Sequence, residues 1–302
     1  MKTLFVLLGP TSVGKTKLSI RIARHLECPI ISADSRQIYK EMPIGSDAPT
    51  EQIRTQIEHF FVASQSIIDY YSASLFEEQA LSLINKLHET HEHLLLCGGS
   101  MLYIDAVCKG IDDMPTVTQE IRYAIWKQYH EQGLDSLLDE LQKSDPLHYE
   151  EVDRKNHRRV IHALEICRMT QKPYSSFRTQ KVKIRPFKIC KIGLSRDRTQ
   201  LYESINTRVN EMIDNGFVDE ASSLFPMRQL NALNTLGYKE LFAYLNHTCT
   251  LPEAVEKIKC NTRTYARKQM TWFKRDSEIK WFNPDNEDDI IAYMDTVINE
   301  SK

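Results

Sequence analysis

A glycine-rich segment near the start of the chain has the residue types and spacing that bind phosphate groups. Residues 9–16 fit the pattern G-x-x-x-x-G-K-[ST], after a short apolar run and before residues at helical spacing. In such a turn the backbone N–H groups and the helix N-terminus face an anion, the lysine pairs with phosphate oxygens, and the hydroxyl holds Mg²⁺. We therefore expect Mg²⁺ here, with Thr16 as its protein ligand. The predicted diphosphate-binding residues are Gly9, Pro10, Thr11, Ser12, Val13, Gly14, Lys15 and Thr16.

Two more polar segments follow apolar runs that indicate buried strands. Asp34 comes after the run that starts at Pro29, and Gly98-Gly99-Ser100 comes after residues 93–97. The Asp34 carboxylate could bind Mg²⁺, accept a proton from a nucleophile, or cap the next turn. The Ser100 hydroxyl could face the diphosphate or cap a helix. No acid ends the 93–97 run, so the Mg²⁺-binding aspartate typical of nucleotide hydrolases is not expected there.

These segments must be positioned by a sheet. Strand and helix patterns alternate over the first hundred residues, which predicts an α/β fold with a P-loop-type parallel sheet and flanking helices. The polar segments then lie together at the carboxyl ends of the strands. Helical patterns dominate from about Pro115, with separate helices over 117–132 and 134–142, and a long helix is expected over about 252–273. Residues 189–194 indicate a returning strand. We predict a catalytic core formed by residues 1–112 and 191–302, with a mostly helical insertion domain over 113–190.

Basic residues are concentrated in two stretches, although the net charge is only −2. Residues 154–198 contain 14 lysines and arginines against two acids, and residues 257–275 contain seven and no acid. In the second stretch Arg263, Arg267 and Lys274 share a helical face, with Tyr265 and Trp272 nearby. Cations interleaved with aromatic rings suit phosphate contacts and base stacking in RNA. The alternative is that both stretches are solvated helix faces.

Cysteine usage and hydropathy indicate the compartment. The seven cysteines are scattered and form no C-x-x-C pair, which is typical of reduced thiols in a cytoplasmic protein. No apolar run approaches the length that spans a membrane, so no membrane association is expected. Nothing in the sequence requires more than a monomer.

Seven ordered blocks together resemble the tRNA dimethylallyltransferase family, also called tRNA isopentenyltransferases or IPP transferases. The resemblance extends over about residues 4–282, and several blocks at the right spacing are more specific than the phosphate-binding pattern alone. The blocks are GPTSVGKT at 9–16, ADSRQIY at 33–39, GGSMLY at 98–103, DP at 145–146, RRVIHALE at 158–165, LGYKEL at 236–241 and TRTYARKQMTWF at 262–273.

The resemblance implies a reaction and assigns roles. The dimethylallyl group of dimethylallyl diphosphate would move to N6 of the adenosine 3′ to the anticodon in tRNA. Lys15, Arg208 and Ser100 would stabilise the departing diphosphate, and Asp34 would act as general base. The residues implied to contact tRNA are Asp34, Ser35, Arg36, Gln37, Arg122, Arg158, Arg159, Val160, Ile161, His162, Leu236, Gly237, Tyr238 and Lys239, to which the basic helix adds Arg263 and Arg267.

The chain departs from the family pattern in a few places. Ser100 replaces a threonine and His162 a frequent arginine, Ala48 occupies a frequent lysine position, and residues 58–61 read Glu-His-Phe-Phe where Pro-His-His-Leu is common. Because of these departures, the resemblance defines the family more firmly than it defines the preferred prenyl donor or the catalytic rate.

Two other functions compete with a prenyltransferase. A small-molecule P-loop kinase, which binds ATP, would use the phosphate-binding turn and Asp34 but would leave both basic stretches unexplained. An RNA-binding module with a degenerate turn is disfavoured because Lys15, Thr16 and Asp34 are intact.

Overall fold

The computed structural model describes residues 1–179 and 181–300 and divides the chain into two compact units. The larger unit comprises Met1–Cys108 and Ile184–Lys302, and the smaller comprises Lys109–Lys183. The predicted boundaries at 113 and 190 are therefore displaced by a few residues. The return boundary is earlier because Arg185 already binds the larger unit, where its Nε donates to the Val107 carbonyl at 2.8 Å.

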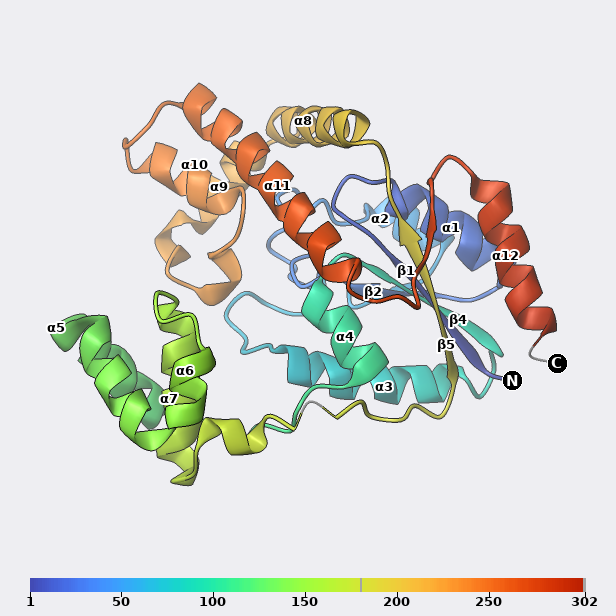
Figure 1. Ribbon diagram of the computed structural model, residues 1–302. Helices are drawn as coiled ribbons and strands as arrows, with labels where there is room; N and C mark the ends of the chain where they lie inside the picture. The colour runs from blue at the N-terminus through green and yellow to red at the C-terminus, as the bar shows by residue number, and fades with distance from the viewer. Residues whose placement is uncertain (180, 301–302) are drawn as a thin grey trace. The chain divides into compact units, whose positions relative to one another are not determined.

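The larger unit is built on one six-stranded sheet in which all paired strands are parallel (Figure 1), as expected for a P-loop-type α/β fold. Buried apolar side chains fill most strand positions, because helices cover both faces of the sheet. The strands are β1 Thr3–Leu8, β2 Ile30–Ala33, β3 His59–Phe60, β4 His93–Gly98, β5 Lys188–Leu194 and β6 Lys280–Phe282.

The strand order and register bring three chain segments to one edge. The order is β3-β2-β4-β1-β5-β6, and Gly98 is in register with both Leu8 and Ala33. The residues that follow β1, β4 and β2 therefore emerge side by side. This register requires glycine at position 98, because the Cβ of any other residue would lie 2.2 Å from the Ala33 carbonyl oxygen.

Helices account for most of the rest of the larger unit as far as the structure describes it. Figure 1 shows α3 and α4 on one side of the sheet and α1 and α12 on the other. The helix α11, predicted over 252–273, is confirmed within one residue. These helices are α1 Lys15–His25, α2 Glu51–Gln56, α3 Ala73–Leu87, α4 Met101–Lys109 (whose last residue is in the smaller unit), α8 Arg198–Asp214, α9 Phe217–Leu224, η2 Phe225–Met227, η3 Asn231–Leu233, α10 Tyr238–Leu245, α11 Leu251–Phe273 and α12 Glu287–Asn299.

The smaller unit is mainly helical, as predicted for the insertion. The long helix is interrupted where the sequence places a glycine, because Gly133 adopts a φ of +80°. Asp145 is fully buried and accepts hydrogen bonds from the amides of His148, at 3.0 Å, and Ser175, at 2.6 Å, which joins two helical segments. The elements are α5 Gln119–Ser144, α6 Pro146–Glu151, α7 His157–Thr170 and η1 Tyr174–Phe177.

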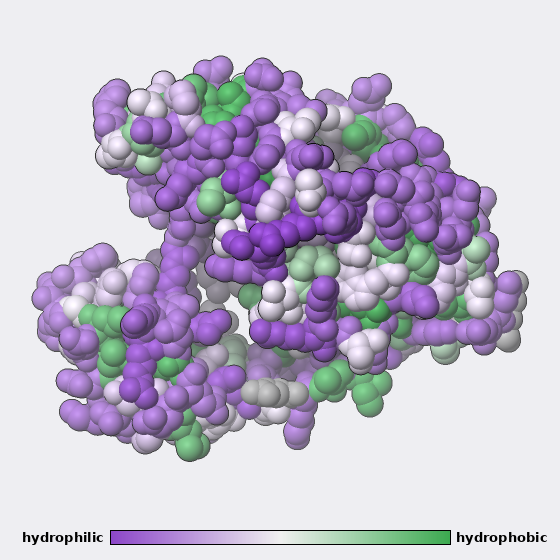
Figure 2. All heavy atoms as spheres, turned by 45° about the horizontal axis from the view of Figure 1, so that its top comes forward, coloured by the Kyte–Doolittle hydropathy of each residue, from purple (hydrophilic) through white to green (hydrophobic). Residues whose placement is uncertain are grey.

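The surface gives no sign of a membrane-spanning segment. Within the described residues, no helix combines the length and apolar character needed to cross a bilayer. In Figure 2 hydrophilic residues cover most of the visible face, and hydrophobic residues occur in small separate patches. All seven cysteines are free thiols, as expected from their scattered positions.

Candidate active site

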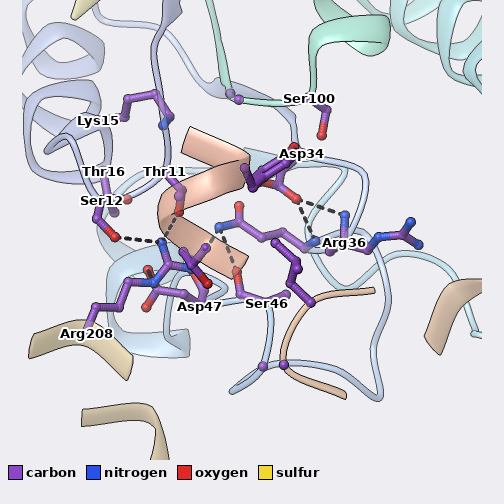
Figure 3. Close-up of a pocket in the computed structure, with 18 of the residues that line it drawn as sticks. Thr11, Ser12, Lys15, Thr16, Asp34, Arg36, Ser46, Asp47, Ser100 and Arg208 are labelled. Atoms are coloured by element: carbon purple, nitrogen blue, oxygen red, sulfur yellow. Dashed lines mark hydrogen bonds and ion pairs between the residues drawn. The ribbon is translucent and has the colours of Figure 1, made fainter. Parts of the chain in front are cut away.

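A cavity of about 600 Å³ opens in the larger unit at the edge where β1, β2 and β4 end. The phosphate-binding turn, the Asp34 turn and the Gly98-Gly99-Ser100 loop form one part of its wall. Further parts come from α8, α11, the loop around Asp47 and residues 234–239. Sequence reasoning predicted that the first three segments would meet, and the register confirms it. Figure 3 shows the side chains of these segments directed toward a common space.

Lys15 lies at the start of α1 and folds back over the turn before it. Its Nζ donates to the carbonyl oxygens of Gly9, at 3.0 Å, and Pro10, at 2.7 Å. Burial lowers the pKa of Lys15 to about 8, against the raising effect of Cys97 and Asp34. The ammonium is therefore poorly solvated and is positioned to exchange two carbonyl partners for an anion.

Arg208 reaches the phosphate-binding turn from α8, a position that no local sequence signal determined. Its Nη1 donates to Thr11 Oγ1 at 2.6 Å, and its Nε lies 3.2 Å from the Asp47 carboxylate (Figure 3). The guanidinium is thus shared between the turn and an acid on the cavity wall. A diphosphate in the turn would meet Lys15 and Arg208 together.

Asp34 follows β2 and uses one oxygen to fix its own turn. Its Oδ1 accepts hydrogen bonds from the backbone amides of Arg36, at 2.8 Å, and Gln37, at 3.2 Å. Capping, one of the three roles considered, is therefore satisfied by a single oxygen. Tyr265 on α11 lines the same cavity, where burial, followed by the charge of Asp34, raises its pKa to about 12, so its phenol stays protonated.

Ser100 lines the cavity and also supports the Asp34 turn. Its buried hydroxyl accepts a hydrogen bond from the Ser35 amide at 2.8 Å and lies 3.1 Å from the Ser35 hydroxyl. The glycine loop after β4 therefore holds the Asp34 turn in place.

Arg36 and Gln37 are also engaged with the protein. Arg36 Nη1 donates to the Ala232 carbonyl at 3.1 Å, and Gln37 Nε2 donates to the Asp47 carbonyl at 2.8 Å. Both side chains connect the Asp34 turn to neighbouring loops.

The segment predicted at 236–239 divides between cavity and core. Leu236, Gly237 and Lys239 line the cavity, and Lys239 is exposed. Tyr238 is fully buried and its hydroxyl donates to Glu220, so its side chain presents no surface to an RNA. A contact between this segment and tRNA stays a prediction, which at Tyr238 could involve only the backbone.

The two arginines of α11 lie outside the cavity wall. Arg263 is half-buried and donates to the Asn206 side chain at 2.7 Å, whereas Arg267 is exposed and donates to Thr264 at 3.0 Å. Thr262 and Tyr265 on the same helix do line the cavity. The helix α11 thus lines the cavity with one face and presents basic side chains on another.

The predicted RNA-contacting segment of the smaller unit is only partly exposed. Arg158, Arg159 and His162 are exposed on α7, while Val160 and Ile161 are buried in the core of this unit. Contact of the segment 158–162 with tRNA stays a prediction, and its exposed side chains are those of Arg158, Arg159 and His162.

His162 and Arg122 share a buried carboxylate. His162 Nδ1 lies 3.6 Å and Arg122 Nε 3.4 Å from the side chain of Glu165. Arg122 therefore belongs to an ion pair beside the exposed arginines of α7.

Sequence reasoning missed three residues of the cavity wall. Asp47 pairs with Arg208, Tyr265 lines the same cavity as Asp34, and Gln269 bridges two loops. Thr262, Tyr265 and Gln269 recur at the three- and four-residue intervals of one helical face. That spacing was a usable signal within a block that was interpreted only through its cations and aromatic rings as an RNA-binding surface. Asp47 had no such signal, because its partner lies in a distant helix.

The residues present suit Mg²⁺ bound jointly with a diphosphate. Among the described residues no group of three or more histidine, cysteine or acidic side chains could hold a metal alone. Mg²⁺ instead takes one or two protein ligands together with phosphate oxygens and water. Thr16 is exposed at the first turn of α1 and lines the cavity, which fits a hydroxyl ligand of this kind.

Known proteins resemble this chain in sequence and in fold. The IPP transferase family model matches residues 37–276. A "tRNA dimethylallyltransferase 2" of Parabacteroides distasonis is 57% identical, with 97% of this chain and 98% of that protein covered. The crystal structure of the tRNA isopentenylpyrophosphate transferase of Bacillus halodurans superimposes with a TM-score of 0.71 at 32% identity, covering 99% of this chain and 96% of that one.

A more distant structure supports the fold alone. A eukaryotic dimethylallyltransferase, solved acting on tRNA, has a TM-score of 0.78 at 24% identity and covers 94% of this chain and 74% of that one. The family match and the 57% identity each extend over most of the sequence. The chain therefore belongs to the IPP transferase family.

Proposed function

We propose that this protein transfers the dimethylallyl group of dimethylallyl diphosphate to N6 of the adenosine 3′ to the anticodon in tRNA. The observation that carries the proposal is the register of β1, β2 and β4. It places the phosphate-binding turn and the Asp34 carboxylate in the wall of one cavity, in a chain that belongs to the IPP transferase family.

The donor diphosphate would bind in the phosphate-binding turn. Lys15 and Arg208 both reach this turn, and backbone N–H groups at the start of α1 add positive potential. Negative charge grows on the diphosphate as its bond to C1 breaks, so these groups stabilise the transition state more than the ground state. Mg²⁺ at Thr16 would neutralise further charge on the leaving group.

The acceptor amine would be activated by Asp34. The lone pair of an exocyclic adenine amine is delocalised into the ring, which makes N6 a weak nucleophile. A carboxylate oxygen that accepts the N6 proton raises the electron density at nitrogen as the N6–C1 bond forms. The C1–O bond breaks, diphosphate leaves with the electron pair, and the proton passes to Asp34. Because Oδ1 fixes the turn, the other oxygen is the one assigned to this step.

The nucleic-acid partner is the anticodon stem-loop, from which the adenosine must be unstacked before its amine can enter the cavity. Exposed arginines on α7 and α11 would contact phosphates. We further propose that the protein acts as a monomer in the cytoplasm, because its scattered cysteines are free thiols and nothing in the sequence requires a second chain.

A transfer assay tests the proposal against the kinase alternative. Protein and Mg²⁺ are incubated with an anticodon stem-loop and either labelled dimethylallyl diphosphate or γ-labelled ATP, with a guanosine-substituted stem-loop as control. Label from the prenyl donor on the adenosine RNA alone is the expected result. Label from ATP on any acceptor, with none from the prenyl donor, would favour a kinase.

A further inference from the structure

Gln269 joins two loops of the cavity wall that sequence reasoning treated separately. It lies on α11 and is only 2% exposed. Its Oε1 accepts a hydrogen bond from the Thr11 amide at 2.9 Å, and its Nε2 donates to the Gly99 carbonyl at 2.8 Å. One side chain therefore connects the phosphate-binding turn to the glycine loop after β4.

The orientation of this amide is determined by its partners. A backbone N–H can only donate and a carbonyl can only accept, so the two ends of Gln269 cannot be exchanged. The fit is also close, since a Cβ on Gly99 would lie 2.7 Å from Nε2. An apolar side chain of the same length would leave a buried donor and a buried acceptor unsatisfied.

The contacts continue from Gln269 to the Asp34 turn. Gly99 precedes Ser100, whose hydroxyl accepts the Ser35 amide, and Asp34 precedes Ser35. A continuous path of short hydrogen bonds and single peptide links thus runs from Thr11 to the predicted base. Tyr265, which lines the same cavity as Asp34, lies one helical turn before Gln269 on α11.

We propose that Gln269 is a positioning residue that sets the separation between the phosphate-binding turn and the Asp34 turn. The inference rests on the proposed function, because it concerns the alignment of the two groups that the transfer reaction brings together. Both ends of the Gln269 amide are occupied by the two loops, so the role proposed for it is to hold them. Its loss should affect the alignment of bound reactants more than their binding, because each loop keeps its own ligand-binding groups.

The test compares Gln269→Met with Gln269→Glu. For Gln269→Met we expect kcat for transfer to fall about 10- to 100-fold. Binding of inorganic diphosphate with Mg²⁺ and binding of the stem-loop, both measured directly by calorimetry, should change less than about threefold at temperatures well below the melting point. Gln79→Met is the matched control, because Gln79 is an exposed glutamine on α3.

The second variant adds a pH signature that a general packing role would not produce. In Gln269→Glu, the protonated carboxyl group could donate to the Gly99 carbonyl while accepting from the Thr11 amide, as glutamine does, whereas the carboxylate would repel the carbonyl. Burial favours the neutral form, whereas the ammonium of Lys15, which would lie 3.6 Å from the same Cβ position on Gly99, favours the carboxylate, so the change is expected toward the acidic end of the pH range. Relative to wild type, Gln269→Glu should therefore recover activity as the pH falls, and Gln269→Met should not.

Three outcomes would overturn the inference in a wild-type protein that is active. One is a kcat of Gln269→Met within twofold of wild type. Another is a loss of diphosphate affinity in Gln269→Met as large as its loss of kcat. The third is the same pH dependence of activity in Gln269→Met and Gln269→Glu. An inactive wild-type protein that still binds diphosphate and RNA would instead contradict the proposed function, so the two failures are distinguishable.

Discussion

The buried ammonium group of Lys15 should make the reaction with dimethylallyl diphosphate depend on pH. Its pKa is lowered to about 8 by desolvation, so the charged form that pairs with diphosphate predominates below pH 8 and is lost above it. We predict that kcat/KM for dimethylallyl diphosphate falls about tenfold per pH unit above 8, since kcat/KM reports ionisation of the free enzyme.

Steady-state kinetics between pH 6.5 and 9.5 check this prediction, with inorganic diphosphate binding as a second readout. Tyr265 should not contribute, because its pKa is raised to about 12 and the phenol stays protonated throughout. Tyr265→Phe is the control and should show the same pH profile. A profile that is flat to pH 9.5 would show that Lys15 does not titrate in this range.

Asp34→Asn separates the base from the turn that carries it. The asparagine Oδ1 can still accept the amides of Arg36 and Gln37, so the turn is retained while the proton acceptor is removed. We predict that kcat falls about 100- to 10,000-fold, with stem-loop affinity changed less than threefold. Single-turnover transfer and filter binding measure the two quantities.

Asp69→Asn provides the comparison for the previous change. Asp69 is exposed and also accepts a backbone amide within its own turn, from Ser66 at 3.1 Å. The substitution Asp69→Asn should therefore leave the turnover of the transfer reaction unchanged. If Asp34→Asn kept more than a tenth of wild-type turnover, the assignment of the base would have to be abandoned.

Some residues of the site could be predicted from the sequence and others could not. The phosphate-binding turn and Asp34 were predictable because each is a contiguous segment at the end of a strand. The contact of Gln269 with Thr11 joins residues 258 positions apart, and that of Arg208 with Thr11 joins residues 197 apart. No local pattern encodes such pairs, which depend on where α8 and α11 pack.

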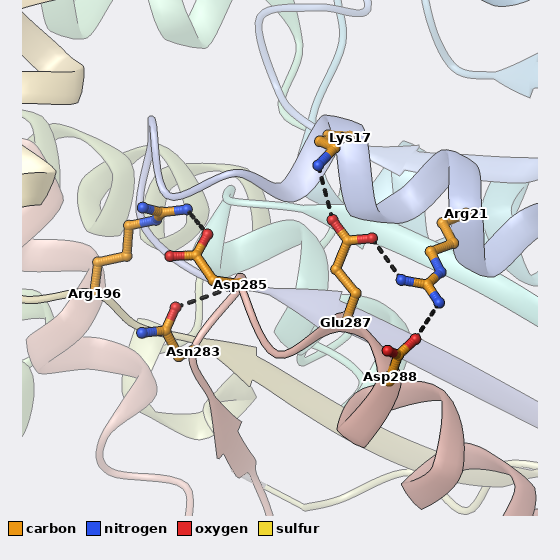
Figure 4. A network of polar contacts seen from close by, with 7 residues as sticks. All are labelled: Lys17, Arg21, Arg196, Asn283, Asp285, Glu287 and Asp288. Atoms are coloured by element: carbon orange, nitrogen blue, oxygen red, sulfur yellow. Dashed lines mark hydrogen bonds and ion pairs between the residues drawn. The ribbon is translucent and has the colours of Figure 1, made fainter.

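At the scale of elements, α12 and the segment before it lie against the phosphate-binding helix. Figure 4 shows Lys17 and Arg21 of α1 directed at Glu287, with Asp288 beside Arg21 and Asp285 paired with Arg196. Arg196 also donates to the Val13 carbonyl at 3.3 Å. Beneath these charges, apolar side chains of α12 join the core of the sheet.

We predict that packing, rather than these ion pairs, holds α12 in place. Met294 is fully buried, so Met294→Ala should lower the free energy of unfolding by about 2–5 kcal/mol. Glu287→Gln should cost far less, because solvent-screened ion pairs contribute little. Urea unfolding of the two variants beside Glu300→Ala, an exposed control, measures the difference; equal losses for Met294 and Glu287 would refute it.

Element prediction succeeded where the periodicity was strong. The helix break at Gly133, the returning strand β5 and the long helix α11 were all expected. The compact smaller unit, Lys109–Lys183, begins and ends a few residues before the predicted insertion of 113–190, because Arg185 already binds the larger unit ahead of β5. Burial of Val160 and Ile161 was readable from the helical spacing but was outweighed by the basic residues around them.

At the scale of the whole molecule, RNA affinity should depend on salt through a few exposed cations. Arg158 and Arg159 are exposed on α7. We predict that replacing both with alanine weakens stem-loop binding for every sequence alike and lowers the slope of log K against log salt by about two. Lys127→Ala, at an exposed position paired with Glu131, should leave the slope unchanged. An unaltered slope in the double variant would remove α7 from the RNA-binding surface.

The central claim is that one cavity brings a diphosphate leaving group and an adenine amine together. The measurement that tests it most directly is a single-turnover reaction of the protein with Mg²⁺, dimethylallyl diphosphate and an anticodon stem-loop, followed by digestion to nucleosides and mass spectrometry. The account predicts N6-(dimethylallyl)adenosine and free diphosphate in equal amounts. Unmodified adenosine, in the presence of bound RNA and bound diphosphate, would contradict it.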